Sequence, residues 1–515
     1  MNVSYLVDRA EKHLQTIDPN KQAVKLESGK AWTYGELNAV SNSYANSLRE
    51  MGIKKGDRIG ILLYNSLEYV ALYFAISKLG AIAVRINFRL TAQELAYILN
   101  DSETTLLCFD LKLAKEIEMI RFSVPVKDYI CLQREDKSSL PAWAKRWNVL
   151  EDGNSVFVSQ DNIDKSDPVM LMYTSGTTGR PKGALWSHEN TLWFCTMQAL
   201  KWGFDSNTIG MTTGPLYHVG ALEDISLATF LSGGTVIITE SGGFNIEKVL
   251  SIIEKEKVTD CFLFPFMIYE MLKLPNLSSF KLDHLQTIYS GGDPITAWAI
   301  DQLNDLLPYI GLVQVYGLTE GTPIATSLDP SDSQEKGYTA GKPMPFTYVK
   351  IVDGENYTLD FEEVGEICVK GPAVSKAYWK KPEETAATFI NGWCHTGDLG
   401  YIDQAGYLTI SGRKKDMIRS GGENIYPVEV ENILIRHHAI QDVAVIGIPD
   451  PKYIESVCAV IVPKFDMSLT EEDIIDFIQD KLASYKKPKK IVFVDELPRT
   501  ASGKVQKFRL KNQYK

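Results

Sequence analysis

The strongest chemical signal in the sequence is a loop dense in glycine, hydroxyl groups and a lysine. The loop reads Tyr173-Thr174-Ser175-Gly176-Thr177-Thr178-Gly179-Arg180-Pro181-Lys182-Gly183. Its glycines let the backbone approach a ligand closely, its hydroxyl and N–H groups can surround phosphate oxygens, and Lys182 adds a cation. A plain turn is the alternative, but this density of small donors favours a phosphate-binding loop. Because Pro181 precedes Lys182, the Walker A pattern is absent and a P-loop NTPase is disfavoured.

A second motif places an aromatic ring, a hydroxyl and a carboxylate at the end of an apolar stretch. It reads Gln314-Val315-Tyr316-Gly317-Leu318-Thr319-Glu320. Tyr316 can stack on a purine, Thr319 can reach a phosphate, and Glu320 can hold Mg²⁺, since hard cations prefer carboxylate oxygen. Alone this motif is weak, because a glutamate at a strand end is usually only solvated. After a phosphate-binding loop it indicates a nucleotide site.

Five further segments combine small residues with charged or hydroxyl side chains. They are Ser290-Gly291-Gly292-Asp293-Pro294, Trp393-Cys394-His395-Thr396-Gly397-Asp398, Ser411-Gly412-Arg413-Lys414-Lys415-Asp416, Ser420-Gly421-Gly422-Glu423-Asn424-Ile425-Tyr426-Pro427 and Leu497-Pro498-Arg499-Thr500-Ala501-Ser502-Gly503-Lys504. With these seven motifs in the family's order along the chain, the sequence resembles the adenylate-forming superfamily of acyl-CoA synthetases, nonribosomal adenylation domains and beetle luciferases. The resemblance covers nearly the whole chain and is nearest to the acyl-CoA synthetases, which are fatty or aryl acid:CoA ligases.

The resemblance implies a set of nucleotide contacts. ATP or AMP would be bound by Thr174, Ser175, Gly176, Thr177, Thr178, Gly179, Lys182, Gly292, Asp293, Tyr316, Gly317, Thr319, Asp398, Arg413 and Lys504. Within that set Asp398 and Arg413 would contact the ribose, and Glu320 and Thr177 would hold Mg²⁺. The catalytic residues would be Lys504, Lys182, Glu320 and His218, the lysines stabilising charge that develops on the α-phosphate.

The second half of the reaction would use a different part of the chain. Lys415 matches the position at which members of the superfamily rotate their C-terminal domain between the two steps. Ser420, Gly421, Gly422 and Glu423 would line the tunnel for the pantetheine arm of coenzyme A. An exposed linker lysine and a simple turn before a helix are the alternatives for these two segments.

The acyl pocket is predicted around Pro215-Leu216-Tyr217-His218-Val219-Gly220-Ala221-Leu222. By resemblance, the residues lining it would be His218, Val219, Gly220, Phe264, Gly291, Gly292, Gly317 and Leu318. Amino-acid-activating relatives carry an aspartate in this segment, whereas this chain has Tyr217-His218, so an uncharged acyl tail is favoured. The sequence assigns no role to Glu223 or Asp224. Arg85 and Phe88 stand where relatives have prolines, which predicts an effect on local packing alone.

The elements that must position these motifs alternate between strand-length apolar runs and helical patterns. Residues 58–63, 66–79 and 81–84 give one strand–helix–strand unit, which indicates parallel sheets covered by helices. We expect an α/β fold with a large N-terminal adenylation domain over residues 1–412. It would include a β-rich, barrel-like subdomain over about 346–412. A hinge at 413–416 and a small mobile α+β domain over 417–515 would follow.

Composition excludes several function classes. The chain has 515 residues and a formal net charge of −11, which disfavours a general nucleic-acid binder. Seven cysteines without a CxxC pair suit reduced thiols in a cytoplasm, and no stretch has the length and apolarity of a transmembrane segment. The C-terminal end is basic, which suits either a solvated face or a phosphate-rich ligand. Both a monomer and a homodimer stay open.

The sequence therefore predicts an ATP-dependent carboxylic acid:CoA ligase with Mg²⁺ as cofactor and ATP and coenzyme A as substrates. The acid is predicted to be a medium- or long-chain fatty acid, with an aryl acid as the alternative. Three rival functions remain. One delivers the acyl group to the phosphopantetheine of a carrier protein, one is a luciferase-like oxygenase, and one is an inactive protein that keeps the fold.

Overall fold

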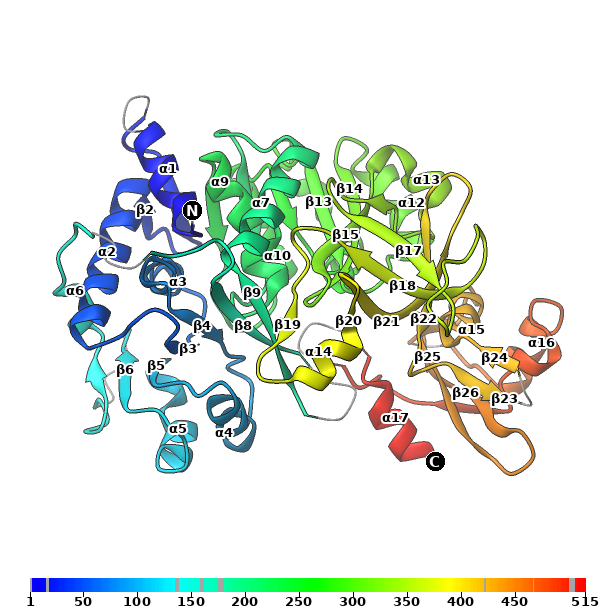
Figure 1. The fold of residues 1–515 in the computed structure, drawn as a ribbon. Helices are drawn as coiled ribbons and strands as arrows, with labels where there is room; N and C mark the ends of the chain where they lie inside the picture. Colours follow the sequence, from blue (N-terminus) through cyan, green and yellow to red (C-terminus); the bar gives the residue numbers. More distant parts are fainter. Residues whose placement is uncertain are drawn as a thin grey trace.

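The computed structural model describes residues 2–14, 18–134, 139–157, 162–174, 180–420, 423–465, 467–499 and 505–515. Four sheets organise these residues (Figure 1). The elements after residue 417, drawn in orange and red, lie at the lower right of the view. The fold is thus mixed α/β, as predicted from the alternating pattern.

A nine-stranded sheet has the order β16-β15-β14-β13-β12-β10-β11-β1-β2. Its strands from β14 to β1 are parallel, and β15, β16 and β2 add antiparallel edges. The strands are β1 (Gln22–Leu26), β2 (Ala31–Thr33), β10 (Ile209–Thr212), β11 (Thr235–Ile238), β12 (Asp260–Phe262), β13 (Thr287–Gly291), β14 (Gly311–Leu318), β15 (Thr322–Leu328) and β16 (Lys342–Pro343).

An eight-stranded sheet has the order β19-β9-β8-β4-β3-β5-β6-β7. It is parallel from β8 to β7, while β9 and β19 run antiparallel at one edge. The strands are β3 (Arg58–Leu62), β4 (Ile82–Arg85), β5 (Leu106–Asp110), β6 (Asp128–Leu132), β7 (Lys145–Arg146), β8 (Pro168–Thr174), β9 (Lys182–Ser187) and β19 (Ala377–Tyr378).

Helices cover both sheets, and α3 lies between them. This helix contacts β4 of one sheet and β1 of the other, and its largely apolar sequence suits burial on most sides. Ser66 caps its start and Gly80, with φ +66°, ends it. The helices of this part are α1 (Tyr5–Leu14), α2 (Tyr34–Glu50), α3 (Leu67–Leu79), α4 (Ala92–Asp101), α5 (Ala114–Ile120), α6 (Asn148–Glu151), α7 (His188–Trp202), α8 (Val219–Ala221), α9 (Ala228–Ser232), α10 (Ile246–Glu256), α11 (Pro265–Leu272), α12 (Ala297–Leu306), α13 (Ser333–Lys336) and α14 (Pro382–Thr388).

The antiparallel region expected after residue 346 is a sheet that branches at β21. Its order is β17-β18-β21-β20, with β22 also paired to β21. The strands are β17 (Tyr348–Val352), β18 (Gly365–Lys370), β20 (Phe389–Ile390), β21 (Trp393–Ile402) and β22 (Leu408–Arg413). The turn that links β22 to the next sheet contains residues 414–417, and the hinge predicted at 413–416 overlaps it.

A separate sheet with its own apolar core forms the C-terminal part. Its order is β24-β23-β26-β25, with β27 paired to β26. Helix α16 ends at Ile478, and the turns that follow bring buried Leu482 onto the same core. The elements are β23 (Ile418–Ser420), β24 (Glu423–Ile425), α15 (Pro427–Leu434), β25 (Ile440–Asp450), β26 (Ile454–Pro463), α16 (Glu471–Ile478), β27 (Lys490–Phe493) and α17 (Lys507–Tyr514).

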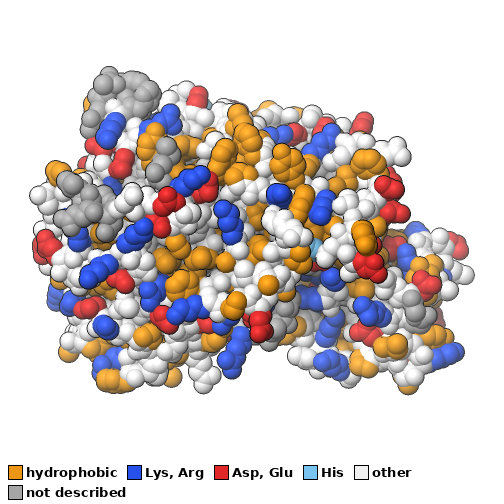
Figure 2. Space-filling model, in the orientation of Figure 1, with side chains coloured by type: hydrophobic (Ala, Val, Ile, Leu, Met, Phe, Trp, Pro, Cys, Tyr) orange, Lys and Arg blue, Asp and Glu red, His pale blue; other side chains and the backbone are white. Residues whose placement is uncertain are grey.

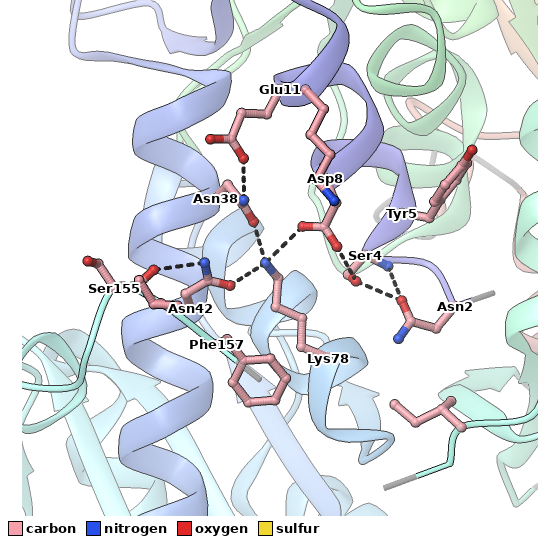
Figure 3. Close-up of a pocket in the computed structure, with 13 residues that line it drawn as sticks. Asn2, Ser4, Tyr5, Asp8, Glu11, Asn38, Asn42, Lys78, Ser155 and Phe157 are labelled. Atoms are coloured by element: carbon pink, nitrogen blue, oxygen red, sulfur yellow. Dashed lines mark hydrogen bonds and ion pairs between the residues drawn. The ribbon is translucent and has the colours of Figure 1, made fainter. Parts of the chain in front are cut away.

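A polar pocket of about 640 Å³ lies between α1, α2 and α3, away from the motifs (Figure 3). The Lys78 ammonium is buried there and donates to Asn38, to Asn42 at 2.6 Å and to Asp8 at 3.2 Å. A lysine has three donors, and all three are satisfied. We therefore assign Lys78 to fastening α1 onto α2. In the described residues, no helix has the length and apolar character needed to span a bilayer.

Candidate active site

The predicted site residues gather where parallel strands end. The segments after β10, β12 and β13 carry His218, Phe264 and Gly292, and Leu318 is the last residue of β14. These four strands are neighbours in the nine-stranded sheet. Thr174 ends β8 of the other sheet. Ligands of open α/β sheets bind in the crevice outside the carboxyl ends of the strands. The topology therefore places motifs from distant parts of the chain on one crevice between the two sheets.

A hydroxyl–carboxylate contact joins the two sheets at this crevice. The Thr174 Oγ1 donates to Glu320 Oε1 at 2.7 Å, and the Tyr378 hydroxyl donates to the same oxygen at 3.0 Å. Lys182 pairs with Thr174 across β8 and β9, and its Nζ lies 5.5 Å from the centre of the Tyr378 ring. Burial and then the Glu320 carboxylate raise the pKa of Tyr378, so its hydroxyl stays a donor. The structure thus brings three predicted residues together and adds Tyr378.

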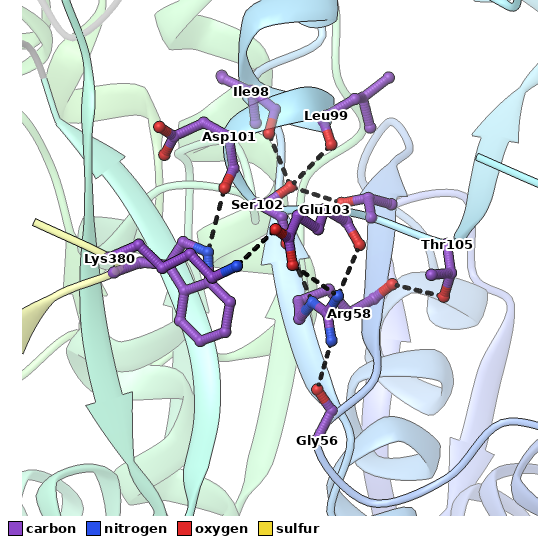
Figure 4. A network of polar contacts seen from close by, with 11 residues as sticks. Gly56, Arg58, Ile98, Leu99, Asp101, Ser102, Glu103, Thr105 and Lys380 are labelled. Carbon is purple, nitrogen blue, oxygen red and sulfur yellow. Dashed lines mark hydrogen bonds and ion pairs between the residues drawn. The ribbon is translucent and has the colours of Figure 1, made fainter. Parts of the chain in front are cut away.

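Sequence reasoning missed Tyr378 because no motif marks it. A polar network holds the segment that carries it (Figure 4). The Trp379 indole donates to the Asp101 carbonyl at 3.1 Å, Lys381 pairs with the Asp101 carboxylate at 2.8 Å, and Lys380 pairs with Glu103. These contacts fasten β19 to the end of α4. They fix the position from which Tyr378 reaches Glu320.

The turn that carries Glu320 is held from two sides. The buried Trp186 indole donates to the Thr319 carbonyl at 2.9 Å, and the Ser375 amide donates to the Glu320 carbonyl at 3.0 Å. Gly317 precedes the turn, and a Cβ there would lie 2.3 Å from the Pro323 carbonyl oxygen. Only glycine fits that close approach of two backbone strands. The glycine that the motif contains is therefore required by packing.

The predicted ribose residues form a second polar cluster. Asp398 and Arg413 are register partners on β21 and β22, and Arg413 Nε lies 2.7 Å from Asp398 Oδ1. The Tyr316 hydroxyl donates to Asp398 Oδ2 at 2.8 Å. Asp398 is buried, with 5% of its surface exposed, whereas the side chain of Arg413 is exposed to solvent. Each carboxylate oxygen keeps acceptor capacity for a hydroxyl ligand.

The predicted acyl segment follows β10 and is fixed by its own backbone contacts. His218 Nδ1 accepts from the Gly220 amide at 3.0 Å, which holds the imidazole over the start of α8. Val219 and Gly220 are buried in α8. A Cβ at Gly214 would lie 3.5 Å from the Phe264 ring and 3.2 Å from Ala221. The segments after β10 and β12 therefore meet at this point, as the predicted pocket requires.

Arg85 has a larger part than the local packing expected from the sequence. Its side chain ends β4 and forms a fully buried ion pair with Glu223, both being 0% exposed. Its Nη2 also donates to the Leu216 carbonyl and, at 3.2 Å, to the His218 carbonyl. Against the lowering effect of burial, the Glu223 carboxylate holds the pKa of Arg85 above its usual value. Arg85 thus ties the acyl segment of one sheet to the other sheet.

Two glycines and an acid follow β13 at the same edge. Gly291 pairs with Val315 of β14, and a Cβ on Gly291 would lie 2.6 Å from the Val315 carbonyl oxygen. Gly292 has φ +96°, a conformation that favours glycine. Asp293 is exposed beside it. The contacts keep Gly291 and Gly292 next to β14, while the part that Asp293 plays stays a prediction.

Several predicted residues lie outside the described residues. They are Ser175, Gly176, Thr177, Thr178 and Gly179 of the loop, Gly421 and Gly422 of the tunnel, and Lys504. Lys415 is exposed in the turn between β22 and β23, and Ser420 pairs with Glu423 in the hairpin of β23 and β24. Their predicted parts in rotation and in the coenzyme A tunnel stay predictions.

The donors around Glu320 fit Mg²⁺. The Glu320 carboxylate and Thr174 hydroxyl are hard oxygen ligands within 2.7 Å of each other, and Mg²⁺ in nucleotide sites typically takes one or two protein oxygens besides phosphate and water. Within the described parts of the chain, no group of three or more His, Cys, Asp and Glu side chains is arranged to hold a metal ion. Glu320 and Thr174 suit a metal that also binds the phosphates of a nucleotide.

Comparison with known proteins identifies the family of the chain. Residues 12–379 match the AMP-binding enzyme family, and residues 429–504 match the AMP-binding enzyme C-terminal domain. A feruloyl-CoA synthase of an Amycolatopsis species is 36% identical over 502 residues, which are 97% of this chain and 97% of that protein. The long-chain-fatty-acid–CoA ligase FadD13 of Mycobacterium tuberculosis is 34% identical over 502 residues, 97% of this chain and 96% of that protein. The crystal structure of the anthranilate CoA ligase AuaEII in complex with anthranoyl-AMP superposes with a TM-score of 0.90 at 27% identity, covering 100% of this chain and 97% of that one.

Proposed function

Since this chain belongs to the AMP-binding enzyme family and is an AMP-forming acid–thiol ligase, we propose how it divides that work among its residues and which acid it takes. It is an ATP-dependent acid:CoA ligase. The acid and the roles of individual residues are the proposal. The observation that carries it is the contact of Glu320, which follows β14, with Thr174, which pairs with Lys182. The acyl segment follows β10 of the same sheet as β14.

In the first step a carboxylate oxygen of the acid attacks the α-phosphorus of ATP. A P–O bond forms, the bond to the β-phosphate oxygen breaks, and pyrophosphate leaves. No general base is needed, because the acid is already ionised near neutral pH. The protein must position two anions and offset their repulsion. Lys182 and, when it enters the site, Lys504 supply positive charge, and His218 contacts the acid's carboxylate.

The nucleotide is oriented by the cluster around Asp398. Its carboxylate accepts from the ribose hydroxyls, and Arg413 and Tyr316 hold it in place through the contacts described above. Glu320 and Thr174 would supply oxygens to Mg²⁺, beside the Thr177 predicted from the sequence, and the metal would neutralise phosphate charge. Thr319 lies in the same turn and contributes a hydroxyl towards the α-phosphate.

In the second step the thiol of coenzyme A attacks the acyl carbonyl and AMP leaves. Rotation at Lys415 would bring Ser420, Gly421, Gly422 and Glu423 to the site for this step. Basic side chains gather around α17 on the face shown in Figure 2, and they suit the phosphates of coenzyme A. Some of them are paired with acids, among them Lys507 with Glu431 at 2.7 Å. A carrier-protein phosphopantetheine is the alternative acceptor.

For the acid we propose an aromatic carboxylic acid. Aromatic rings border the acyl segment. Phe88 packs edge-on against Tyr217 with ring centroids 5.3 Å apart, and Phe264 stacks with Phe266 with centroids 6.4 Å apart. Rings favour offset or edge contacts with other rings. Feruloyl-CoA synthase and the anthranilate ligase, both similar to this chain, support the same class. A fatty acid, predicted from the sequence, is the second candidate, and the similarity to FadD13 and the apolar residues Val219 and Phe264 favour it.

The test is pyrophosphate release across a panel of benzoates, cinnamates and fatty acids, each with and without coenzyme A. We expect turnover that requires coenzyme A, with kcat/KM highest for an aromatic acid. Glu320→Gln should reduce turnover strongly, while Glu472→Gln, an exposed glutamate of α16, should not. Highest kcat/KM for a fatty acid would move the assignment to the second candidate. Pyrophosphate formed to one equivalent only would point to a carrier protein as the acceptor.

A further inference from the structure

A buried acidic turn follows α8 in the acyl segment. Glu223 and Asp224 lie in the π-helical stretch Leu222–Leu227 and are 0% and 4% exposed. The backbone leaves helical geometry at Asp224, and Ile225 has φ +68°. A β-branched residue rarely adopts a left-handed conformation, and such strain clusters at functional sites. The turn is therefore a candidate for a role in ligand binding.

The two carboxylates of the turn differ in their partners. Glu223 pairs with Arg85, and its backbone carbonyl accepts from Gln198 Nε2 at 3.0 Å. Asp224 Oδ1 is buried and, among the described residues, has no hydrogen-bond partner. Burial, followed by the neighbouring Glu223, raises the pKa of Asp224 well above its usual value. A buried polar group without a partner is rare and costly, so this one requires an explanation.

The position of Asp224 supplies one. A Cβ placed on Gly220 would lie 3.6 Å from Asp224 Oδ2 and 3.1 Å from His218 Nδ1. The imidazole of His218 and the carboxyl group of Asp224 therefore both face Gly220. His218 is the residue proposed to contact the substrate carboxylate. Asp224 thus lies close to the place proposed for the acid.

We infer that Asp224 recognises a hydrogen-bond donor, a hydroxyl or an amino group, on the acyl part of the acid substrate. The inference rests on the proposed function and narrows its substrate class to polar-substituted acids. Such a donor, bound beside His218, supplies a partner for the Asp224 carboxyl group, whose Oδ1 has none among the described residues. A plain alkyl chain or an unsubstituted ring leaves that oxygen unsatisfied, and sites built for a hydrogen bond reject analogues that lack it.

The test compares acids that differ only by one substituent. Benzoate is paired with its hydroxy and amino derivatives, cinnamate with hydroxycinnamates, and octanoate with hydroxyoctanoates. We expect kcat/KM for pyrophosphate release to favour at least one donor-bearing acid over its parent by about 10- to 100-fold. In Asp224→Leu, which has no acceptor, that preference should fall to within about threefold while the parent acid is still used.

Two further variants keep the result interpretable. Asp260→Asn is a matched control, because Asp260 is also a buried acid of the same sheet but is hydrogen-bonded to Thr259 and Tyr289, and it should leave the preference unchanged. Asp224→Asn preserves the shape of the side chain and serves if the leucine variant does not fold; it should reduce the preference for an amino group most.

The outcomes separate this inference from the proposed function. Turnover of aromatic acids with no preference for a donor, or a preference that survives in both Asp224 variants, would overturn the inference alone. Loss of the preference in Asp260→Asn as well would also overturn it, since the effect would not be specific to Asp224. No pyrophosphate release with any acid would overturn the proposed function, and the inference with it.

Discussion

The Arg85–Glu223 ion pair yields the prediction that follows most directly from the observed contacts. Both side chains are fully buried, and Arg85 also donates to two carbonyls of the acyl segment. Arg85→Met keeps an unbranched side chain but leaves Glu223 buried without its cation. Breaking a buried pair by removing one partner costs about 3–5 kcal/mol. We expect the free energy of unfolding to fall by about that amount.

A double-mutant cycle isolates the pair. Glu223→Gln strands the Arg85 charge and should also be strongly destabilising, whereas the double variant strands neither charge. Its loss should be smaller than the sum of the single losses by about 2 kcal/mol or more. In Arg85→Met, burial raises the pKa of Glu223 with no cation to oppose it. A raised folded-state pKa makes stability fall as pH rises, so the loss should be larger at about pH 8 than at about pH 5.

Urea unfolding followed by tryptophan fluorescence measures these values. Lys201→Met is the control, because its pair with Asp329 at 2.7 Å is partly exposed and should contribute under about 1 kcal/mol. If the loss in the double variant equals the sum of the two single losses to within about 0.5 kcal/mol, the coupling is refuted. A loss in Arg85→Met no larger than in Lys201→Met would refute the burial argument itself.

Three further predictions concern the site. Asp398→Asn should raise the KM for ATP about tenfold or more, because charge-assisted contacts are lost; steady-state kinetics check this, and an unchanged KM would count against the ribose assignment. Tyr378→Phe should lower kcat/KM about fivefold by removing one hydrogen bond to Glu320. Tyr407→Phe, which loses a hydroxyl contact to Asp332, should leave kcat/KM unchanged. Equal effects of the two substitutions would contradict a role for Tyr378 at the site. Burial raises the pKa of Asp224 in the folded state well above its usual value of 3.8. As pH rises from that value, the free energy of unfolding of the wild type should therefore fall relative to that of Asp224→Asn, by up to about 1.4 kcal/mol per pH unit. Unfolding experiments at several pH values measure this difference, and parallel curves for the two proteins would refute the prediction.

Part of the fold and of the site follows from local sequence pattern. The strand at 58–62 and the helix after Ser66 are confirmed because alternation of buried strands and capped helices is a local property. Glu320, Asp398 and Arg413 are predicted as site residues because each stands in a motif whose residue types suit the chemistry. The meeting of Glu320 with Thr174 follows from the crevice rule once the strand order is known.

Other parts depend on contacts between distant residues. Tyr378 reaches Glu320 only because β19 pairs with β9, a pairing that no local pattern announces. Arg85 was expected to affect only local packing, yet it forms an ion pair with Glu223, 138 positions along the chain. Sequence cannot show that a charged residue in an apolar strand has a buried partner until both positions are placed in three dimensions.

The most direct test of the central claim follows one oxygen atom. The acid that gives the highest turnover is labelled with ¹⁸O in its carboxylate and incubated with ATP, Mg²⁺ and coenzyme A, and the products are analysed by mass spectrometry. Attack of a carboxylate oxygen on the α-phosphorus predicts one labelled oxygen in the phosphate of AMP and none in pyrophosphate. Label in inorganic phosphate with ADP as the nucleotide product, or AMP without label, would contradict an acyl-adenylate.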